Sequence, residues 1–198
     1  MTTRYVTWLL AIPAISALVV LLLPRGWEKT IKRFSIGAML VELVISIRLI
    51  LADYSDAGYH FVEQVAWVES FGISYKVGID GLSLWLVILT TLRSPSARYP
   101  SWGSITTRIK EYAFSFLLLE LGMLGAFVAL DLFLFYVFWE LMLVPMYLII
   151  GVWGGKDRVY AAVKFFLYTM VGSLLMLVAI LYLVASYEKL AMHYSFDL

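Results

Sequence analysis

The sequence predicts an all-α fold, a polytopic transmembrane bundle of about six spanning helices with its N-terminus outside the cell. The first observation that predicts it is the composition. Of the 198 residues, 63% are hydrophobic and only 15% are charged. Soluble domains carry about 25% charged residues. The second observation is a series of long apolar runs, and the third is that Lys and Arg gather in alternate connections. A chain of this length cannot bury so much apolar surface in water, so the bilayer is its solvent.

Each long apolar run predicts a spanning helix, because about 20 residues cross the hydrocarbon core and backbone groups cannot face lipid without partners. The run 5–23 follows Arg4 and ends in Pro24-Arg25 without a small-residue cleavage pattern. We therefore interpret it as a retained helix rather than a signal peptide. The other long runs cover residues 34–51, 112–130, 132–152 and 160–184.

The distribution of charge orients these helices and adds a sixth. Cytoplasmic connections carry an excess of Lys and Arg. The basic connections contain Arg25, Lys29, Lys32 and Arg33, then Arg93, Arg98, Arg108 and Lys110, then Lys156 and Arg158. Because basic connections on one side need an even number of crossings between them, the short run 82–92, extended back to Val77, must form a span. We expect a short interfacial helix or a hairpin in the acid-leaning outer loop 53–80.

The chain 1–198 shows no internal repeat, and we interpret it as a single membrane domain without a cofactor of its own. The absence of cysteine excludes disulfides, iron–sulfur clusters and Cys-based zinc sites. His60 and His193 both fall in predicted extramembrane segments, so they cannot hold a haem within the bilayer. Neither a Walker A pattern nor G-x-G-x-x-G occurs, and the net charge of +1 indicates no nucleic-acid partner.

Ionisable residues within the predicted spans are the candidates for chemistry, because they are costly in hydrocarbon and often mark ion pathways. They are Glu42, Arg48, Glu120, Glu140 and Lys164. Glu140 is the strongest, since it lies about 13 Å along its helix from Asp131. Burial there favours a neutral carboxyl group that can take up and release a proton. Pro145 cannot donate to the Leu141 carbonyl, which would open the helix to water. A hydrogen-bonded structural glutamate is the alternative.

Lys164 and Glu120 are weaker candidates. Lys164 lies about 9 Å from the cytoplasmic side, where it either snorkels to the interface or pairs with a carboxylate such as Glu140. Glu120 lies about 16 Å from Asp131 along the preceding helix. The tight connection at Asp131 makes these two helices antiparallel neighbours, so Glu120 and Glu140 could share a hydrogen bond. For both residues the structural and the functional interpretation stay open.

Three segments resemble the subunit M family of bacterial NADH–quinone oxidoreductase, called chain 4 in mitochondria and chloroplasts. They are Val-Gly-Ile-Asp-Gly-Leu-Ser-Leu at 77–84, the block 129–147 that ends in Phe-Trp-Glu-Leu-Met-Leu-Val-Pro-Met-Tyr, and Ala-Val-Lys-Phe-Phe-Leu-Tyr-Thr at 162–169. The resemblance implies a proton-translocating subunit of respiratory complex I in the bacterial inner membrane, with Glu140 as the titrating acid and Lys164 as its charge neighbour. It also implies FMN, iron–sulfur clusters, NADH and quinone in other subunits, and antiporter-like subunits and lipid as partners.

The chain departs from the family in two respects. It covers less than half of the family's length, so the seventh-helix lysine that pairs with the glutamate matching Glu140 is absent. Residues 93–100 read Arg-Ser-Pro-Ser-Ala-Arg-Tyr-Pro where the family continues an apolar helix, which suggests a compensated reading-frame shift or a sequence error. The alternatives are a subunit of a multisubunit sodium/proton antiporter or of a membrane-bound hydrogenase, or a truncated fragment that does not pump.

Overall fold

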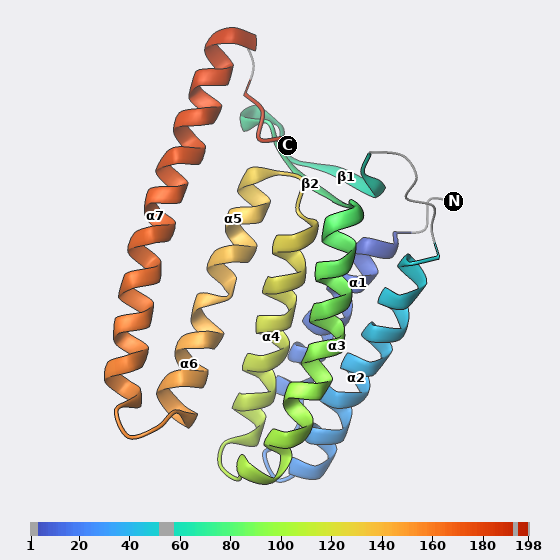
Figure 1. Ribbon diagram of the computed structural model, residues 1–198, viewed down its shortest axis with the longest axis vertical. Helices are drawn as coiled ribbons and strands as arrows, with labels where there is room; N and C mark the ends of the chain where they lie inside the picture. Colours follow the sequence, from blue (N-terminus) through green and yellow to red (C-terminus); the bar gives the residue numbers. More distant parts are fainter. Residues whose placement is uncertain (1–3, 52–57, 192–193, 198) are drawn as a thin grey trace.

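The computed structural model describes residues 4–51, 58–191 and 194–197, which form a helical bundle with a β-hairpin at one end (Figure 1). The helices are α1 (Tyr5–Leu22), α2 (Glu28–Leu49), α3 (Gly81–Ser104), α4 (Ile109–Val128), α5 (Leu132–Leu141), α6 (Leu143–Trp153) and α7 (Arg158–Ala191). The predominantly helical fold that the sequence predicts is confirmed. Part of the outer loop, and His193, lie outside the described residues.

All basic connections lie at the same end of the bundle. The α1–α2, α3–α4 and α6–α7 connections lie together at the bottom of Figure 1, whereas the hairpin and both chain ends lie at the top. This is the arrangement that the alternation of charge predicts. The top end in Figure 1 is therefore the end that we assign to the outside.

The outer loop forms a hairpin, one of the two structures expected for it. Strand β1 (His60–Val68), the short 3-10 turn η1 (Glu69–Phe71) and strand β2 (Ile73–Ile79) make a two-stranded antiparallel sheet, in which Ala66 lies opposite Ser74. Gly72 has a φ of 66°, a left-handed conformation that glycine adopts without steric cost. A Cβ atom at Gly72 would also meet the Tyr194 carbonyl, so the turn requires glycine at this position for two reasons.

Helix α3 differs most from its prediction. Val77 belongs to strand β2, so the backward extension of this span to Val77 is wrong. The helix begins at Gly81 because Asp80 and Ser83 cap it reciprocally: Ser83 N–H donates to Asp80 Oδ1 at 2.7 Å, and Asp80 N–H donates to Ser83 Oγ at 2.9 Å. Hydrogen bonding of the Asp80 carboxyl group with the side chain and the N–H of Ser83 holds the pKa of Asp80 below its usual range. The helix instead gains its length beyond residue 92, since it continues through the unusual segment 93–100 to Ser104.

The span expected at 132–152 is a continuous helical segment with one break in its hydrogen bonding. Helix α5 ends at Leu141 and α6 begins at Leu143. Met142 keeps helical φ and ψ, but its N–H bonds to the Trp139 carbonyl at 3.3 Å, three residues back. Pro145 explains the break, because it has no N–H to offer the Leu141 carbonyl.

Four helical segments in the described part of the chain are long and apolar enough to cross a membrane. They are Tyr5–Leu22, Ile109–Val128, Leu132–Trp153 and Arg158–Lys189. Helix α2 starts in the basic connection and is less hydrophobic, and α3 contains the segment 93–100. A total of six spans therefore stays a prediction.

The buried apolar side chains form three clusters. Buried apolar side chains of α1, α2, β2, α3, α4 and α5 form one cluster, and those of α1, α2 and α4 form a second. A third cluster joins the hairpin and Phe196 to α5 and α7. Helix α1, the retained helix of the sequence prediction, packs closely against α4 and α2. Helix α7 instead packs mainly on α6, and its outer side bears many exposed apolar residues.

Candidate functional site

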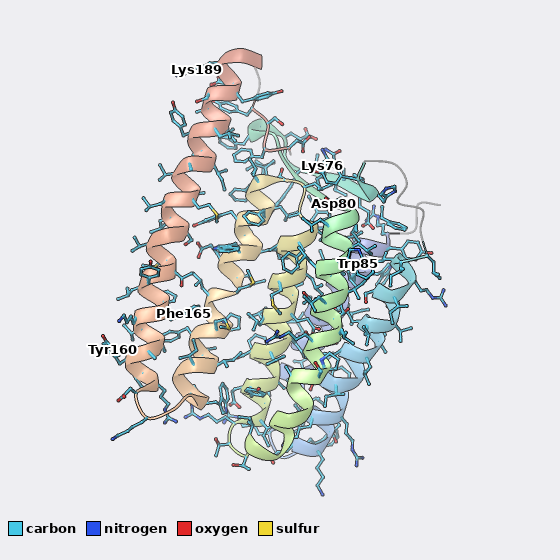
Figure 2. All side chains as sticks on the ribbon, viewed as in Figure 1. Lys76, Asp80, Trp85, Tyr160, Phe165 and Lys189 are labelled. Carbon is cyan, nitrogen blue, oxygen red and sulfur yellow. The ribbon has the colours of Figure 1, made fainter. Side chains whose placement is uncertain are left out.

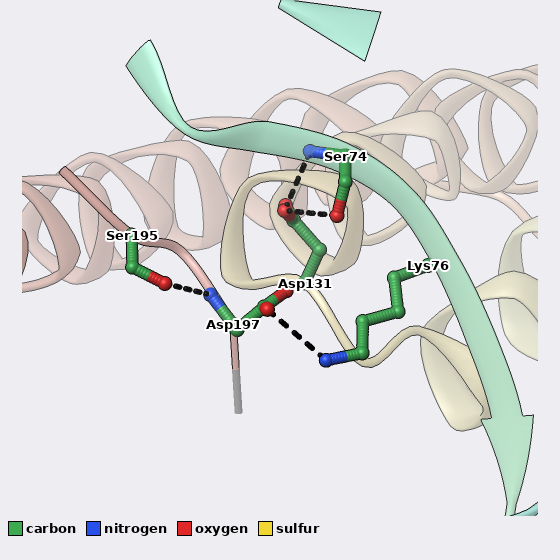
Figure 3. Close-up of polar contacts among 5 residues, drawn as sticks. All are labelled: Ser74, Lys76, Asp131, Ser195 and Asp197. Carbon is green, nitrogen blue, oxygen red and sulfur yellow. Dashed lines mark hydrogen bonds and ion pairs between the residues drawn. The ribbon is translucent and has the colours of Figure 1, made fainter. Parts of the chain in front are cut away.

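The corner between α4 and α5 fixes the position of the candidate acids. Asp131, fully buried, caps α5 by accepting hydrogen bonds at Oδ1 from Phe133 N–H and Leu134 N–H, both at 3.0 Å. Its other oxygen accepts from Ser74 N–H of β2 at 2.9 Å (Figure 3). One buried carboxylate therefore joins the hairpin to the start of α5, the helix that carries Glu140.

A second polar contact joins the hairpin to α1. Glu63 of β1 accepts from Val6 N–H at 2.9 Å and from Thr7 N–H at 3.2 Å, in the first turn of α1. The Thr7 hydroxyl bonds to Glu63 and lies 3.1 Å from the Tyr75 hydroxyl. Burial is the main reason that the pKa of Tyr75 is raised. The hairpin therefore closes the outer end over α1 as well as over α5.

Glu140 occupies the last turn of α5, directly before the break at Met142. The residue is partly buried, and its Oε1 is buried without a hydrogen-bond partner. The Tyr136 hydroxyl, one turn earlier, lies near both the Glu140 carboxyl group and the Ser173 hydroxyl of α7. The site thus contains an acid, two hydroxyl groups and an interruption in the helical hydrogen bonding at Met142.

Lys164 lies on a different face of α7. Ser173 follows it by nine residues, or about two and a half helical turns, which places the two side chains on opposite sides of the helix. The Lys164 ammonium lies 5.8 Å from the centre of the Tyr160 ring, and Figure 2 shows Tyr160 on the side of α7 away from α6. Both residues line an apolar groove of about 720 Å³. In the described part of the chain, Lys164 forms no ion pair with Glu140.

Glu120 faces α2 rather than α5. Gly122 and Gly125 form the side of α4 that contacts α5, since a Cβ atom at either would meet Met142 or the Phe138 ring. Glu120 precedes Gly122 by two residues, about 200° around the helix, and its carboxyl group interacts with that of Glu42 on α2. The structure therefore brings Glu120 to Glu42 and does not bring it to Glu140.

Glu42, one of the ionisable residues predicted within a span, lies in the interior of the bundle. It is fully buried, and so are Ser35, Met39, Ser46 and Leu49 on the same face of α2. These positions are separated by three or four residues, the spacing of one helical face. That spacing was present in the sequence and could have placed Glu42 in the interior.

In the described residues, no group of three or more His, Cys, Asp or Glu side chains could hold a metal ion. The polar groups of the two acid sites are carboxyls and hydroxyls, whose chemistry is the binding and transfer of protons.

Comparisons with known proteins agree with this picture. Residues 129–197 match the family described as NADH:quinone oxidoreductase/Mrp antiporter, TM. The chain is 44% identical over 193 residues to NADH-quinone oxidoreductase subunit M of Rhodobacter capsulatus, covering 94% of this chain and 37% of that protein. It is 41% identical to NADH-ubiquinone oxidoreductase chain 4 of Chondrus crispus, covering 85% of this chain and 35% of that one.

Solved structures share the fold. A chain of respiratory complex I from Thermus thermophilus with bound NADH matches 97% of this chain and 38% of its own length, with 27% identity and a TM-score of 0.79. A chain of the membrane-bound sulfane sulfur reductase, an archaeal respiratory membrane complex, matches with a TM-score of 0.77 at 22% identity, covers 93% of this chain and 38% of its own length, and supports the fold alone. The resemblance found in the sequence is confirmed, for a chain that spans less than half the length of these relatives.

Proposed function

We propose that this chain, which matches a partial region of the subunit M and chain 4 family, is an antiporter-like membrane subunit that carries protons across the bilayer. In this proposal it forms one membrane domain of an NADH-quinone oxidoreductase in the bacterial inner membrane. Electron transfer from NADH through FMN and iron–sulfur clusters to quinone takes place in other subunits, and antiporter-like neighbours flank this chain. The observation that carries the proposal is the placement of Glu140 at a break in an apolar helix.

Glu140 is suited to take up and release a proton. An ionised carboxylate in hydrocarbon is costly, so the neutral form is favoured unless water or a cation is near. The break at Met142 provides a place where water can reach the helix beside the acid. Tyr136 and Ser173 continue the polar path toward α7. A change in the hydration or charge around Glu140 would therefore change the proton affinity of its carboxyl group.

Lys164 has a secondary role in this proposal. Its ammonium lies on the opposite side of α7 from Ser173, so its influence on Glu140 acts over a distance and not through a contact. A cation at that depth still favours the ionised form of nearby acids. We expect the loss of Lys164 to affect transport less than the loss of Glu140.

A sodium/proton antiporter subunit without a redox partner is the second candidate. The description of the matching family includes Mrp antiporters beside NADH:quinone oxidoreductases. Dependence of proton transport on sodium, without any dependence on NADH or quinone, would favour this second function.

The test is proton pumping by the assembled complex in inside-out membrane vesicles. We expect Glu140→Gln to reduce NADH-driven pumping at least about tenfold, because the amide cannot bind and release the proton. Glu111→Gln is the matched control, since Glu111 is partly exposed and pairs with Arg25 at 3.3 Å. Assembly is checked for each variant on native gels, and Glu140→Asp, which keeps the acid, should retain part of the pumping. Full pumping by an assembled Glu140→Gln complex would remove Glu140 from the mechanism.

A further inference from the structure

The segment 194–197, which follows α7 along the chain, lies beside the hairpin at the top of Figure 1. Its backbone joins the start of α5, because the Leu132 N–H donates to the Phe196 carbonyl at 2.8 Å. Asp197 also pairs with Asp131 in an isolated antiparallel bridge. We call this segment the strap, since it connects the outer end of α7 to the corner at which α5 begins.

Polar contacts also join the strap to the hairpin. The Lys76 ammonium of β2 lies 3.1 Å from Asp197 Oδ2, and the Lys76 side chain is only 20% exposed (Figure 3). Within the strap, the Asp197 N–H donates to Ser195 Oγ at 3.2 Å. The Tyr194 carbonyl lies close against Gly72 in the hairpin turn. The strap is therefore fixed on two sides, by β2 and by α5.

The side chain of Phe196 enters the interior from the strap. It is 5% exposed and belongs to the buried cluster that it forms with Ile73 of β2 and with Ile180 and Val184 of α7. Its ring also meets that of Phe133 on α5 edge-on, with 6.1 Å between the ring centres. One aromatic ring thus contacts the hairpin, α5 and the outer half of α7 together.

The same cluster reaches the candidate functional site. Met176, Ile180 and Val184 follow Ser173 by three, seven and eleven residues, which is the spacing of one helical face. Met176 packs against the cluster, and so does the ring of Tyr136 on α5. The hydroxyl group of that tyrosine lies near the candidate acid and near Ser173. The packing that contains Phe196 therefore extends to a member of the proposed proton path.

The surroundings of α7 make its attachment at the hairpin end important. Apolar contact alone gives helices little preference for one another in a bilayer, because lipid tails are as apolar as the side chains. Helix α7 packs mainly on α6, and many apolar side chains on its outer side are exposed. Polar contacts at the hairpin end can therefore determine how closely the outer half of α7 approaches α5.

We propose that Phe196 is a positioning residue for the proton path. The strap, fixed to β2 and α5 by its polar contacts, seats Phe196 in the cluster and so holds Tyr136 beside Glu140 and Ser173. This inference rests on the function proposed above and deepens it, because it names an outer element that controls the same site. Without the ring of Phe196, α7 separates from α5 and the polar path is interrupted.

Spin labels test the positioning directly, because the chain has no native cysteine. Val137→Cys on α5 and Leu175→Cys on α7 carry the labels, since both side chains are exposed. In the full chain in lipid vesicles, we expect Phe196→Ala to broaden the distribution of label distances and shift it to longer values. Phe71→Ala removes an exposed ring from the hairpin turn and should change nothing. An unchanged distribution in Phe196→Ala would overturn the proposal.

Proton pumping by the assembled complex tests whether the positioning acts through Tyr136. We expect Phe196→Ala to reduce NADH-driven pumping about three- to tenfold, because transfer between groups is sensitive to their placement. In a Tyr136→Phe background the same substitution should add little further loss, since the hydroxyl group is already gone. A residue that only stabilises the fold would cause the same fold loss in both backgrounds. That result, or full pumping by Phe196→Ala, contradicts the proposal.

The ion pair of the strap gives a second variant if Phe196→Ala fails to assemble on native gels. Lys76→Glu places two negative charges together and should broaden the label distances, and adding Asp197→Lys should narrow them again. Unchanged distances in Lys76→Glu would show that the strap does not position α7. The distance measurement does not involve pumping, so failure of the strap is distinguishable from failure of the proposed function, which Glu140→Gln tests.

Discussion

The molecule has a closely packed half, which contains α1, α2 and α4, and a more open half, which contains α5, α6 and α7. Glutamates that are wholly or partly buried occur in both halves, but their surroundings differ. In the most apolar stretches of α1 and α4, 39% and 44% of residues are buried, against 17% in the α5–α6 segment and 17% in α7. Glu42 and Glu120 lie in the closely packed half and have no exposed surface. Glu140 lies in the open half, partly buried and beside a break in its helix.

Depth in the membrane does not by itself determine what an acid can do. A carboxyl group enclosed by packed helices keeps its proton, because nothing replaces the water that an ionised form requires. In our proposal, a carboxyl group next to a broken helix exchanges its proton through water that reaches the break. The proton transfer proposed for Glu140 therefore depends on the break in its helix and not on depth alone.

The largest effect on stability is expected at Asp131, where α4 of the closely packed half meets α5 of the open half. Asp131→Ala removes the cap of α5 and leaves the buried Ser74 N–H without its partner. Together these losses should lower the free energy of unfolding by about 2–4 kcal/mol. Unfolding in detergent, followed by circular dichroism, measures the change. Stability equal to that of the native chain would show that the corner does not hold α5 against the hairpin.

A matched pair of glycine substitutions sharpens the contrast in packing. A Cβ at Gly125 would lie 2.2 Å from the Phe138 ring, whereas a Cβ at Gly172 in α7 would meet nothing within 4 Å. We expect Gly125→Ala to destabilise the chain by about 1–3 kcal/mol through overpacking. Gly172→Ala should be neutral or stabilising by up to about 1 kcal/mol, because alanine favours helix. Equal effects in the same unfolding experiment would contradict the difference between the two halves.

The smallest effect is expected at Lys164. Lys164→Ala should reduce NADH-driven pumping by about two- to threefold at most, since an interfacial lysine contributes less than a titrating acid. Lys156→Ala, in the basic connection before α7, is the control for a general loss of positive charge. A loss as large as that in Glu140→Gln would show that Lys164 is an essential partner of the acid.

The sequence was sufficient for those features that depend on composition and spacing along one helix. Five apolar runs, the grouping of the basic connections and an interruption of helical hydrogen bonding near Pro145 all correspond to structure. The start of α3 was placed wrongly because the apolar residues of strand β2 continue directly into the apolar run of the helix, and only the cap at Asp80 separates them.

The partners of the acids could not be predicted from the sequence, because they depend on how several helices pack together. Glu120 was expected near Glu140 because their helices are adjacent, and they are. Which side of α4 faces α5 depends on Gly122 and Gly125, which allow the close approach of Phe138 and Met142. Lys164 similarly points away from Glu140 because Ser173, and not Lys164, lies on the side of α7 that faces Tyr136.

The accessibility of position 140 to water tests the central claim most directly, and the absence of native cysteine makes the measurement specific. Glu140→Cys and Glu42→Cys would each be treated, in intact vesicles, with a small water-borne thiol reagent and with a large impermeant one. We predict that the small reagent modifies position 140 but not position 42, and that the large one modifies neither. Equal reactivity at the two positions, or labelling of position 140 by the large reagent, would contradict a membrane-embedded acid that exchanges its proton with water.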